Sequence, residues 1–421
     1  MGKKRASLPI CHLSVLRSKL VFSIFLVFCF FALVRLNQPG SGSGSSTNKS
    51  RIEEKPKPET TTNPKVAFLF LARKNIPLDF MWGAFFQEAN VKNFSIYIHS
   101  EPGFVFNEST SMSPFFYGCQ LNNSIKVAWG ESSMIEAERL LLKVALRDPA
   151  NRRFVLLSDS CLPLYKFRDI YEHLISSQKS YVESYFDFED DRYDPKMLQA
   201  IPKDKWRKGS QWFTLIRRHA QIVADDNVVF PIIKKSCKRQ SNASASAIRQ
   251  MLDLHKLQDC IPDEHYLQTL LAMSGLENEF SRRSLTYAQW NQSPTQKDEQ
   301  WHPVTFDYTD ASPRSIKEIK EIEAIHYESE NQTEWCQVNR APAPCFLFAR
   351  KFTCGAAVRL LSEGLLGPFD PVPFLNATRG FFPAKHTDTH ARQSLPNWRD
   401  IFTYSTLDSK SKSRRTFFTT P

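Results

Sequence analysis

One short segment of this sequence could supply a catalytic carboxylate. Residues 261–266 (IPDEHY) place two acids directly before an apolar pattern with helical spacing. One interpretation is a helix start, where Pro is favoured and acidic side chains complement the helix dipole. The other is a general base, in which Glu264 takes a proton from an attacking hydroxyl group. The spacing by itself favours the helix start.

A second group of candidates is cationic. Arg350 and Lys351 follow the apolar stretch Cys345–Phe348, which we predict to be a strand, and Arg340 precedes it. Cations gathered at a strand end could neutralise the negative charge of a departing diphosphate. Ordinary solvated cations are the alternative, and these residues by themselves favour that alternative.

Common cofactor and metal signatures are absent from the sequence. It contains no G-x-G-x-x-G, P-loop, G-x-S-x-G or H-E-x-x-H motif, and no Cys/His cluster with metal spacing. The acidic run 187–191 (DFEDD) could hold a metal, although a solvated charged loop explains it about as well. We therefore expect no metal and no cofactor, and keep a metal-dependent reaction at 187–191 as an alternative.

The elements that must position these residues alternate between strand and helix. Ser133 and Glu136 have the spacing of a capping box at a helix start. The alternation predicts an α/β fold with a doubly wound, mainly parallel sheet. The expected strands are 65–72, 94–99, 125–129 and 154–157, and the expected helices begin at 133 and cover 167–177.

Such sheets bind ligands beyond the carboxyl ends of their strands. The residues at or just after those ends are therefore candidates for a binding pocket. They are Ala72, Arg73, Lys74, His99, Glu101, Trp129 and Asp159.

The N-terminal region has the pattern of a membrane anchor. Residues 20–36 are almost entirely apolar, and basic residues precede them, which predicts a single span with residues 1–19 in the cytosol. A cleaved signal peptide is the alternative, but no clear cleavage site follows. Residues 37–64 are rich in Gly, Ser, Thr and Pro and are predicted to form a flexible stem.

The formal net charge of +11 lies mostly at the two ends of the chain. Residues 1–36 contain six basic residues and no acid, and residues 379–421 contain eight basic and three acidic residues. The segment between them is electrically balanced, which argues against nucleic-acid binding by the folded region. We expect the basic tail at 379–421 to be poorly ordered.

Two further features predict a lumenal location. Eight Asn residues after the apolar segment stand in N-x-S/T sequences. Seven cysteines also follow it, and in an oxidising lumen several should form disulfides, with at least one left over because seven is odd. The cysteines are Cys119, Cys161, Cys237, Cys260, Cys336, Cys345 and Cys354.

Taken together and in order, several segments resemble the core-2/I-branching β-1,6-N-acetylglucosaminyltransferase family, particularly its plant branch of brittle-culm-like proteins. The resemblance covers about residues 65–365. The segments that carry it are 67–74 (AFLFLARK), 94–100 (FSIYIHS), 127–139 (VAWGESSMIEAER), 154–164 (FVLLSDSCLPL), 209–213 (GSQWF), 262–265 (PDEH) and 345–352 (CFLFARKF).

The resemblance implies a GT-A-like fold over residues 65–378, lumenal in the Golgi behind a type II anchor. It implies an inverting, metal-independent transfer of a sugar, with N-acetylglucosamine a candidate, from a UDP-sugar to a glycan or glycoprotein. The family's catalytic base falls on Glu264. Basic side chains neutralise the diphosphate, a role for which Arg340, Arg350 and Lys351 are the candidates.

The sequence departs from the family pattern at the donor site. Arg340 lies two residues from the family's diphosphate Arg, and no Lys stands at 365–368, where the family has a second cation. Ser100 and Glu101 replace a nucleotide-contacting Asp. These departures motivate an alternative function, a non-catalytic lumenal protein that binds glycans or acts as a scaffold on the same fold.

Overall fold

The computed structural model describes residues 63–186, 192–239, 260–290, 302–327 and 330–367. All of them fall within one compact unit of the chain. Within these ranges no helix is both long and apolar enough to cross a membrane. The predicted cytosolic tail, the anchor at 20–36, nearly all of the stem and the basic tail at 379–421 lie outside the described residues.

The centre of the fold is a mixed six-stranded sheet in the order β2-β1-β3-β8-β5-β9. Strand β1 pairs in parallel with both β2 and β3, as predicted. Strand β8, however, runs antiparallel to β3 and to β5, so the sheet is parallel only in part. The strands are β1 (Lys65–Leu71), β2 (Phe94–His99), β3 (Asn151–Ser158), β5 (Ser180–Tyr181), β8 (Thr214–Ile216) and β9 (Phe280–Ser281).

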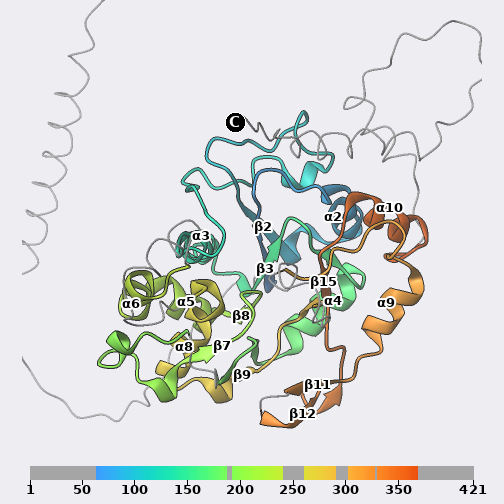
Figure 1. Cartoon of the computed structure of the whole chain (residues 1–421). Coiled ribbons are helices and arrows are strands. Elements are labelled where there is room, and N and C mark those ends of the chain that lie inside the picture. The colour runs from blue at the N-terminus through green and yellow to red at the C-terminus, as the bar shows by residue number, and fades with distance from the viewer. Residues whose placement is uncertain (1–62, 187–191, 240–259, 291–301, 328–329, 368–421) are drawn as a thin grey trace, which may run out of the picture. The chain divides into compact units, whose positions relative to one another are not determined.

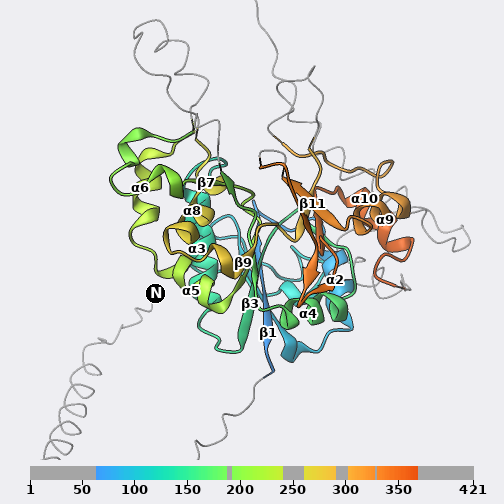
Figure 2. The same cartoon turned by 90° about the horizontal axis from the view of Figure 1, so that it is seen from below.

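Helices cover both faces of this sheet, as the two views in Figures 1 and 2 show. The doubly wound α/β arrangement predicted from the sequence is therefore present. One face carries α2 (Asp79–Gln87), α4 (Phe167–Ser176), α9 (Pro313–Lys320) and α10 (Cys354–Ser362). The other carries α3 (Ser133–Ala145), α5 (Arg217–Asp225), α6 (Val229–Ser236) and α8 (Tyr266–Met273).

The continuous apolar run of β1 is explained by these two helical layers. Successive side chains of a strand point to opposite faces. Phe68 and Phe70 belong to the core beneath α2 and α4, whereas Ala67 and Leu69 belong to the core beneath α3 and α8. Because both faces are buried, no position in the middle of the strand can be polar.

A smaller sheet brings the C-terminal segment to the edge of the main one. Strand β15 (Phe348–Arg350) pairs with β10 (Thr286–Ala288) and with β4 (Leu162–Pro163). Three two-stranded ribbons complete the described strands. They pair β6 (Tyr185–Phe186) with β7 (Arg207–Lys208), β11 (Ala324–Tyr327) with β12 (Gln332–Trp335), and β13 (Gln337–Val338) with β14 (Ala341–Pro342).

Three local predictions are wrong. Residues 125–129 form a loop, because Ile125 bonds to the side chain of His99 instead of to a neighbouring strand. Ser133 lies inside α3 and accepts a hydrogen bond from the Ala128 amide, so it caps nothing. The strand predicted at 345–348 begins only at Phe348, since Cys345 is held in a disulfide.

Two disulfides form among the described cysteines, Cys237–Cys260 and Cys336–Cys345. Cys119, Cys161 and Cys354 are free. The expectation of several disulfides with at least one unpaired thiol agrees with this arrangement.

Phe68→Ala tests the two-layered core. Phe68 is fully buried and makes edge contacts with Trp82, Phe85 and Phe86 at ring-centroid distances of 6.2, 5.8 and 5.2 Å. We expect the substitution to lower the free energy of unfolding by about 3–5 kcal/mol in urea denaturation. The control Val91→Ala, at a side chain that is 68% exposed, should change it by less than about 0.5 kcal/mol. Equal effects of the two substitutions would contradict this packing.

Candidate active site

A cavity of about 1550 Å³ lies at the carboxyl ends of the parallel strands. Leu71 and Ala72 reach it from β1, His99 from β2, and Ser158 and Asp159 from β3. This is the position where open α/β sheets bind their ligands. Residues far along the chain complete the wall, including Glu264 and the pair Arg350 and Lys351.

The cavity brings together all but two of the candidate residues from the sequence, Lys74 and Arg340. Those that line it are Ala72, Arg73, His99, Glu101, Trp129, Asp159, Glu264, Arg350 and Lys351. Arg340 does not line it. Arg340 is exposed on the turn between β13 and β14, where its backbone has φ of 69°. Its proximity in sequence to Cys345 therefore does not place it at this cavity.

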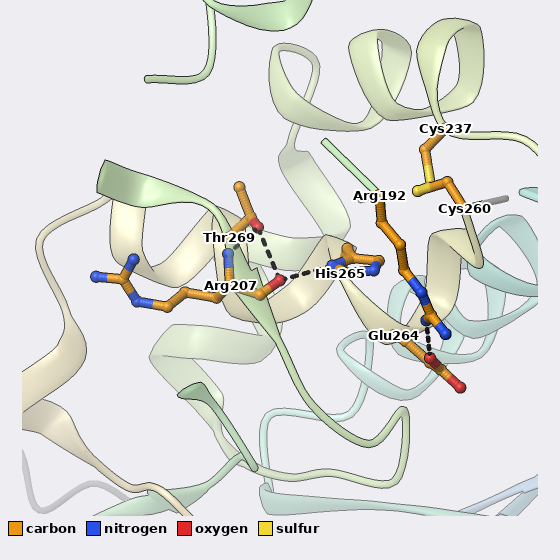
Figure 3. Close-up of a disulfide and its surroundings, with 7 residues drawn as sticks. All are labelled: Arg192, Arg207, Cys237, Cys260, Glu264, His265 and Thr269. Atoms are coloured by element: carbon orange, nitrogen blue, oxygen red, sulfur yellow. Dashed lines mark hydrogen bonds and ion pairs between the residues drawn. A yellow bond between two sulfur atoms is a disulfide. The ribbon is translucent and has the colours of Figure 1, made fainter. Parts of the chain in front are cut away.

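Glu264 ends a short 3-10 helix, Pro262–Glu264, just before α8. Its carboxylate lies 2.6 Å from Nη1 of Arg192, and its side chain is 33% exposed, so it faces the cavity while remaining partly accessible. Figure 3 shows Arg192 reaching down to this carboxylate. The segment is thus a helix start, as one interpretation of the sequence held, and it also presents a carboxylate to the cavity.

The neighbouring His265 points away from Glu264, toward the backbone of Arg207 (Figure 3). Its ring stacks on Trp206 at 4.4 Å, and its Nδ1 donates to the Arg207 carbonyl oxygen at 2.9 Å. Burial lowers the pKa of His265 to about 3, which keeps the ring neutral. His265 therefore anchors the segment and leaves the cavity to Glu264.

Gly209 fixes the position of the Glu264 backbone. The Gly209 amide donates to the Glu264 carbonyl oxygen at 2.9 Å. A Cβ atom at residue 209 would lie 1.9 Å from the carbonyl oxygen of Glu183, so only glycine fits there. A further constraint is the Cys237–Cys260 disulfide, which joins the end of α6 to the residues just before Pro262 (Figure 3).

Three cations, Arg73, Arg350 and Lys351, also line the cavity. Arg350 is largely buried, with its guanidinium 4.4 Å from the ring centre of Trp212. Burial, together with the positive charges of Arg350 and Arg73, lowers the pKa of Lys351. Arg73 pairs with Asp159 at 2.9 Å. Like charges held this close are stabilised by a bound anion, so this part of the cavity suits a diphosphate.

An aromatic group borders these cations. Trp129 is 40% exposed, and both the Arg239 guanidinium, at 4.2 Å, and the His302 ring, at 4.9 Å, pack on it. Nearby, His99 accepts a hydrogen bond from the Ile125 amide through Nε2 at 3.0 Å, and burial lowers its pKa to about 4. The ring proton of the neutral His99 is therefore on Nδ1, which has no partner.

Sequence reasoning missed several residues of this site. Arg192, Trp212 and His302 line the cavity, and Arg239 packs against its rim. Arg192 follows the acidic run at 187–191 and carries no motif of its own, and no signal in the sequence pairs it with Glu264, 72 residues away. Trp212 stands in the GSQWF segment quoted for the family resemblance, which was a signal that could have been used.

Within the described parts of the chain, no group of three or more His, Cys, Asp or Glu side chains is arranged to hold a metal ion. The acidic run at 187–191 lies outside the described residues.

Comparison with known proteins identifies a family. The model of the core-2/I-branching enzyme family matches residues 66–320. Glycosyltransferase BC10 of Oryza sativa subsp. japonica is 50% identical over 309 residues, which cover 72% of this chain and 77% of the rice protein. This confirms the resemblance to the family and to its plant branch.

Solved structures show only a distant likeness. The galactosyltransferase LgtC, in complex with donor and acceptor sugar analogues, has a TM-score of 0.31 at 8% identity, covering 75% of this chain and 100% of LgtC. An active-site mutant of LgtC has a TM-score of 0.29 at 9% identity, covering 68% of this chain and 86% of its own. The family match spans more than half of the chain, and with the rice relative it shows that this protein belongs to the core-2/I-branching enzyme family of glycosyltransferases.

Proposed function

We propose that this protein is an inverting glycosyltransferase that moves a sugar from a UDP-sugar to a hydroxyl group of a glycan or glycoprotein. The observation that carries the proposal is the cavity itself, which is lined both by Glu264 and by the cations Arg350 and Lys351. A carboxylate and a diphosphate-binding group in one cavity are the two parts that this reaction requires.

The proposed reaction is a single displacement. Glu264 takes the proton of the acceptor hydroxyl while that oxygen bonds to the anomeric carbon. The bond from this carbon to the diphosphate breaks on the opposite face, and the leaving UDP takes the electron pair. Arg350 and Lys351 stabilise the charge that develops on the diphosphate, and Arg192 orients the Glu264 carboxylate.

The donor site is proposed to be GT-A-like, with the nucleotide across the carboxyl ends of β1, β2 and β3. N-acetylglucosamine is the first candidate for the transferred sugar, on the basis of the family resemblance. The apolar segment at 20–36, the polar stem and the eight N-x-S/T sequences support a type II anchor with the catalytic domain in the Golgi lumen.

The first test is Glu264→Gln. The amide keeps the shape of the side chain but cannot take the proton, so we expect kcat to fall at least about a hundredfold. UDP affinity, measured by calorimetry, should stay unchanged. Glu363→Gln, at an exposed residue outside the cavity, is the matched control and should retain full turnover. Near-normal turnover of Glu264→Gln would remove Glu264 from the reaction.

The second test compares Lys351→Ala with Arg340→Ala. Lys351 lines the cavity and Arg340 does not. We expect Lys351→Ala to weaken UDP binding about tenfold, since it removes one charge-assisted contact, and Arg340→Ala to leave it unchanged. If Arg340→Ala weakened UDP binding and Lys351→Ala did not, Arg340 and not Lys351 would be the residue that binds the diphosphate. Absence of UDP binding by the unmodified protein would instead favour the non-catalytic, glycan-binding alternative.

The third test is metal removal. Because cationic side chains take the place of a metal in this proposal, excess EDTA should change turnover by less than about twofold. Loss of activity that Mn²⁺ or Mg²⁺ restores would establish a metal-dependent reaction, and would direct attention to the acidic run at 187–191.

A further inference from the structure

Asp263 lines the cavity directly beside Glu264, and the mechanism above does not use it. Only 6% of the residue is exposed, and its Oδ1 has no hydrogen-bond partner. Buried polar atoms without a partner are uncommon because they lose their contacts with water and gain nothing in exchange. An unpartnered acceptor in the wall of a binding cavity points to a hydrogen bond supplied by the ligand.

Charged groups of both signs lie near Asp263. Burial and then the negative charge of Glu264 raise the pKa of Asp263 to about 7, and the positive charge of Arg350 acts in the opposite direction. Asp263 is thus within electrostatic reach of both the proposed base and the proposed diphosphate cation.

Two other carboxyl groups nearby, those of Glu138 and Glu183, lack this combination of features. Glu138 accepts a hydrogen bond from Gln211 Nε2 at 3.1 Å and does not line the cavity. Glu183 does line it, but its carboxyl group accepts a hydrogen bond from the Ser210 backbone. The charged group that acts on the pKa of Glu183 is Glu264 and not Arg350. Among these three carboxyl groups, only Asp263 has an unpartnered oxygen at the cavity wall and both Glu264 and Arg350 as charged neighbours.

The proposed function indicates which part of the donor would face Asp263, and the inference below rests on that function. In an inverting displacement the acceptor oxygen and the leaving diphosphate lie on opposite sides of the anomeric carbon. The transferred sugar therefore occupies the space between Glu264 and Arg350. We infer that Asp263 accepts a hydrogen bond from a hydroxyl group of this sugar and so selects the donor.

A carboxylate in this position discriminates in a simple way. A sugar with a hydroxyl group directed at Oδ1 satisfies the acceptor, whereas an epimer or deoxy analogue leaves it buried and unpaired. Sites built to bind a substrate hydroxyl reject analogues that lack it much more strongly than apolar pockets do. Asp263 is therefore proposed to be a specificity-determining residue that adds to, but does not replace, the binding of the nucleotide.

The test compares UDP with UDP-sugars in the absence of acceptor. Dissociation constants for UDP, UDP-N-acetylglucosamine, UDP-N-acetylgalactosamine, UDP-glucose and UDP-galactose are measured by calorimetry on the full chain. At least one UDP-sugar should bind about tenfold more tightly than UDP. Asp263→Ala should abolish this advantage and Asp263→Asn should reduce it, while UDP itself binds within about twofold of its original affinity.

Glu138→Gln is the matched control, because Glu138 is a buried carboxyl group near Asp263 that does not line the cavity. It should keep the full advantage of the UDP-sugar over UDP. An unchanged advantage in Asp263→Ala, or no advantage in the unmodified protein, would overturn this inference and leave the proposed function intact. If Asp263→Ala does not fold, the shape-conserving Asp263→Asn decides. Failure of the unmodified protein to bind UDP at all would contradict the proposed function itself.

Discussion

The close approach of two backbone segments at Gly209 determines where the candidate base lies. Gly209 passes so near the carbonyl oxygen of Glu183 that no side chain can be accommodated, and its amide bonds to the Glu264 carbonyl oxygen. The 3-10 helix that ends at Glu264 is thereby held against the β6–β7 ribbon. His265, buried and stacked on Trp206, secures the other side of the same segment. With its backbone held in this way, Glu264 lines the cavity.

Both acidic and basic side chains line this cavity, where they are partly shielded from water. Removing a charge from water costs free energy, and an ion pair offsets part of that cost. Here Arg192 pairs with Glu264, and Asp159 pairs with Arg73. The pairing is incomplete, however. Lys351 lies beside two other cations, and Nε of Arg350 and Oδ1 of Asp263 have no partner. The cluster of cations suits a diphosphate and the unpaired carboxyl oxygen suits a hydroxyl group, so the UDP-sugar of the proposed function would satisfy both.

The sheet explains how residues so far apart in sequence meet. The parallel strands β1, β2 and β3 place their carboxyl ends at a common edge, which brings Ala72, His99 and Asp159 together. Strand β8 runs antiparallel to β3, so the start of β8 lies near the carboxyl end of β3. Residues 209–213, which directly precede β8, therefore lie at the same edge of the sheet. Strand β15, in a separate sheet, adds Arg350 and Lys351 by pairing with β4 just after β3.

The sequence by itself determined those features that depend on neighbouring residues. The apolar runs at 65–71 and 94–99 are strands, the segment after Glu264 is a helix, and the ends of the first strands border a cavity, because periodicity and the carboxyl-end rule are local or general properties. The order of the segments also sufficed to identify the family. Only the tertiary structure decided that residues 125–129 are a loop, that Arg340 is outside the cavity, and that Arg192 and Asp263 belong to it. Those outcomes depend on partners many residues away, and neither a side chain's partner nor its removal from water is encoded in the residues next to it.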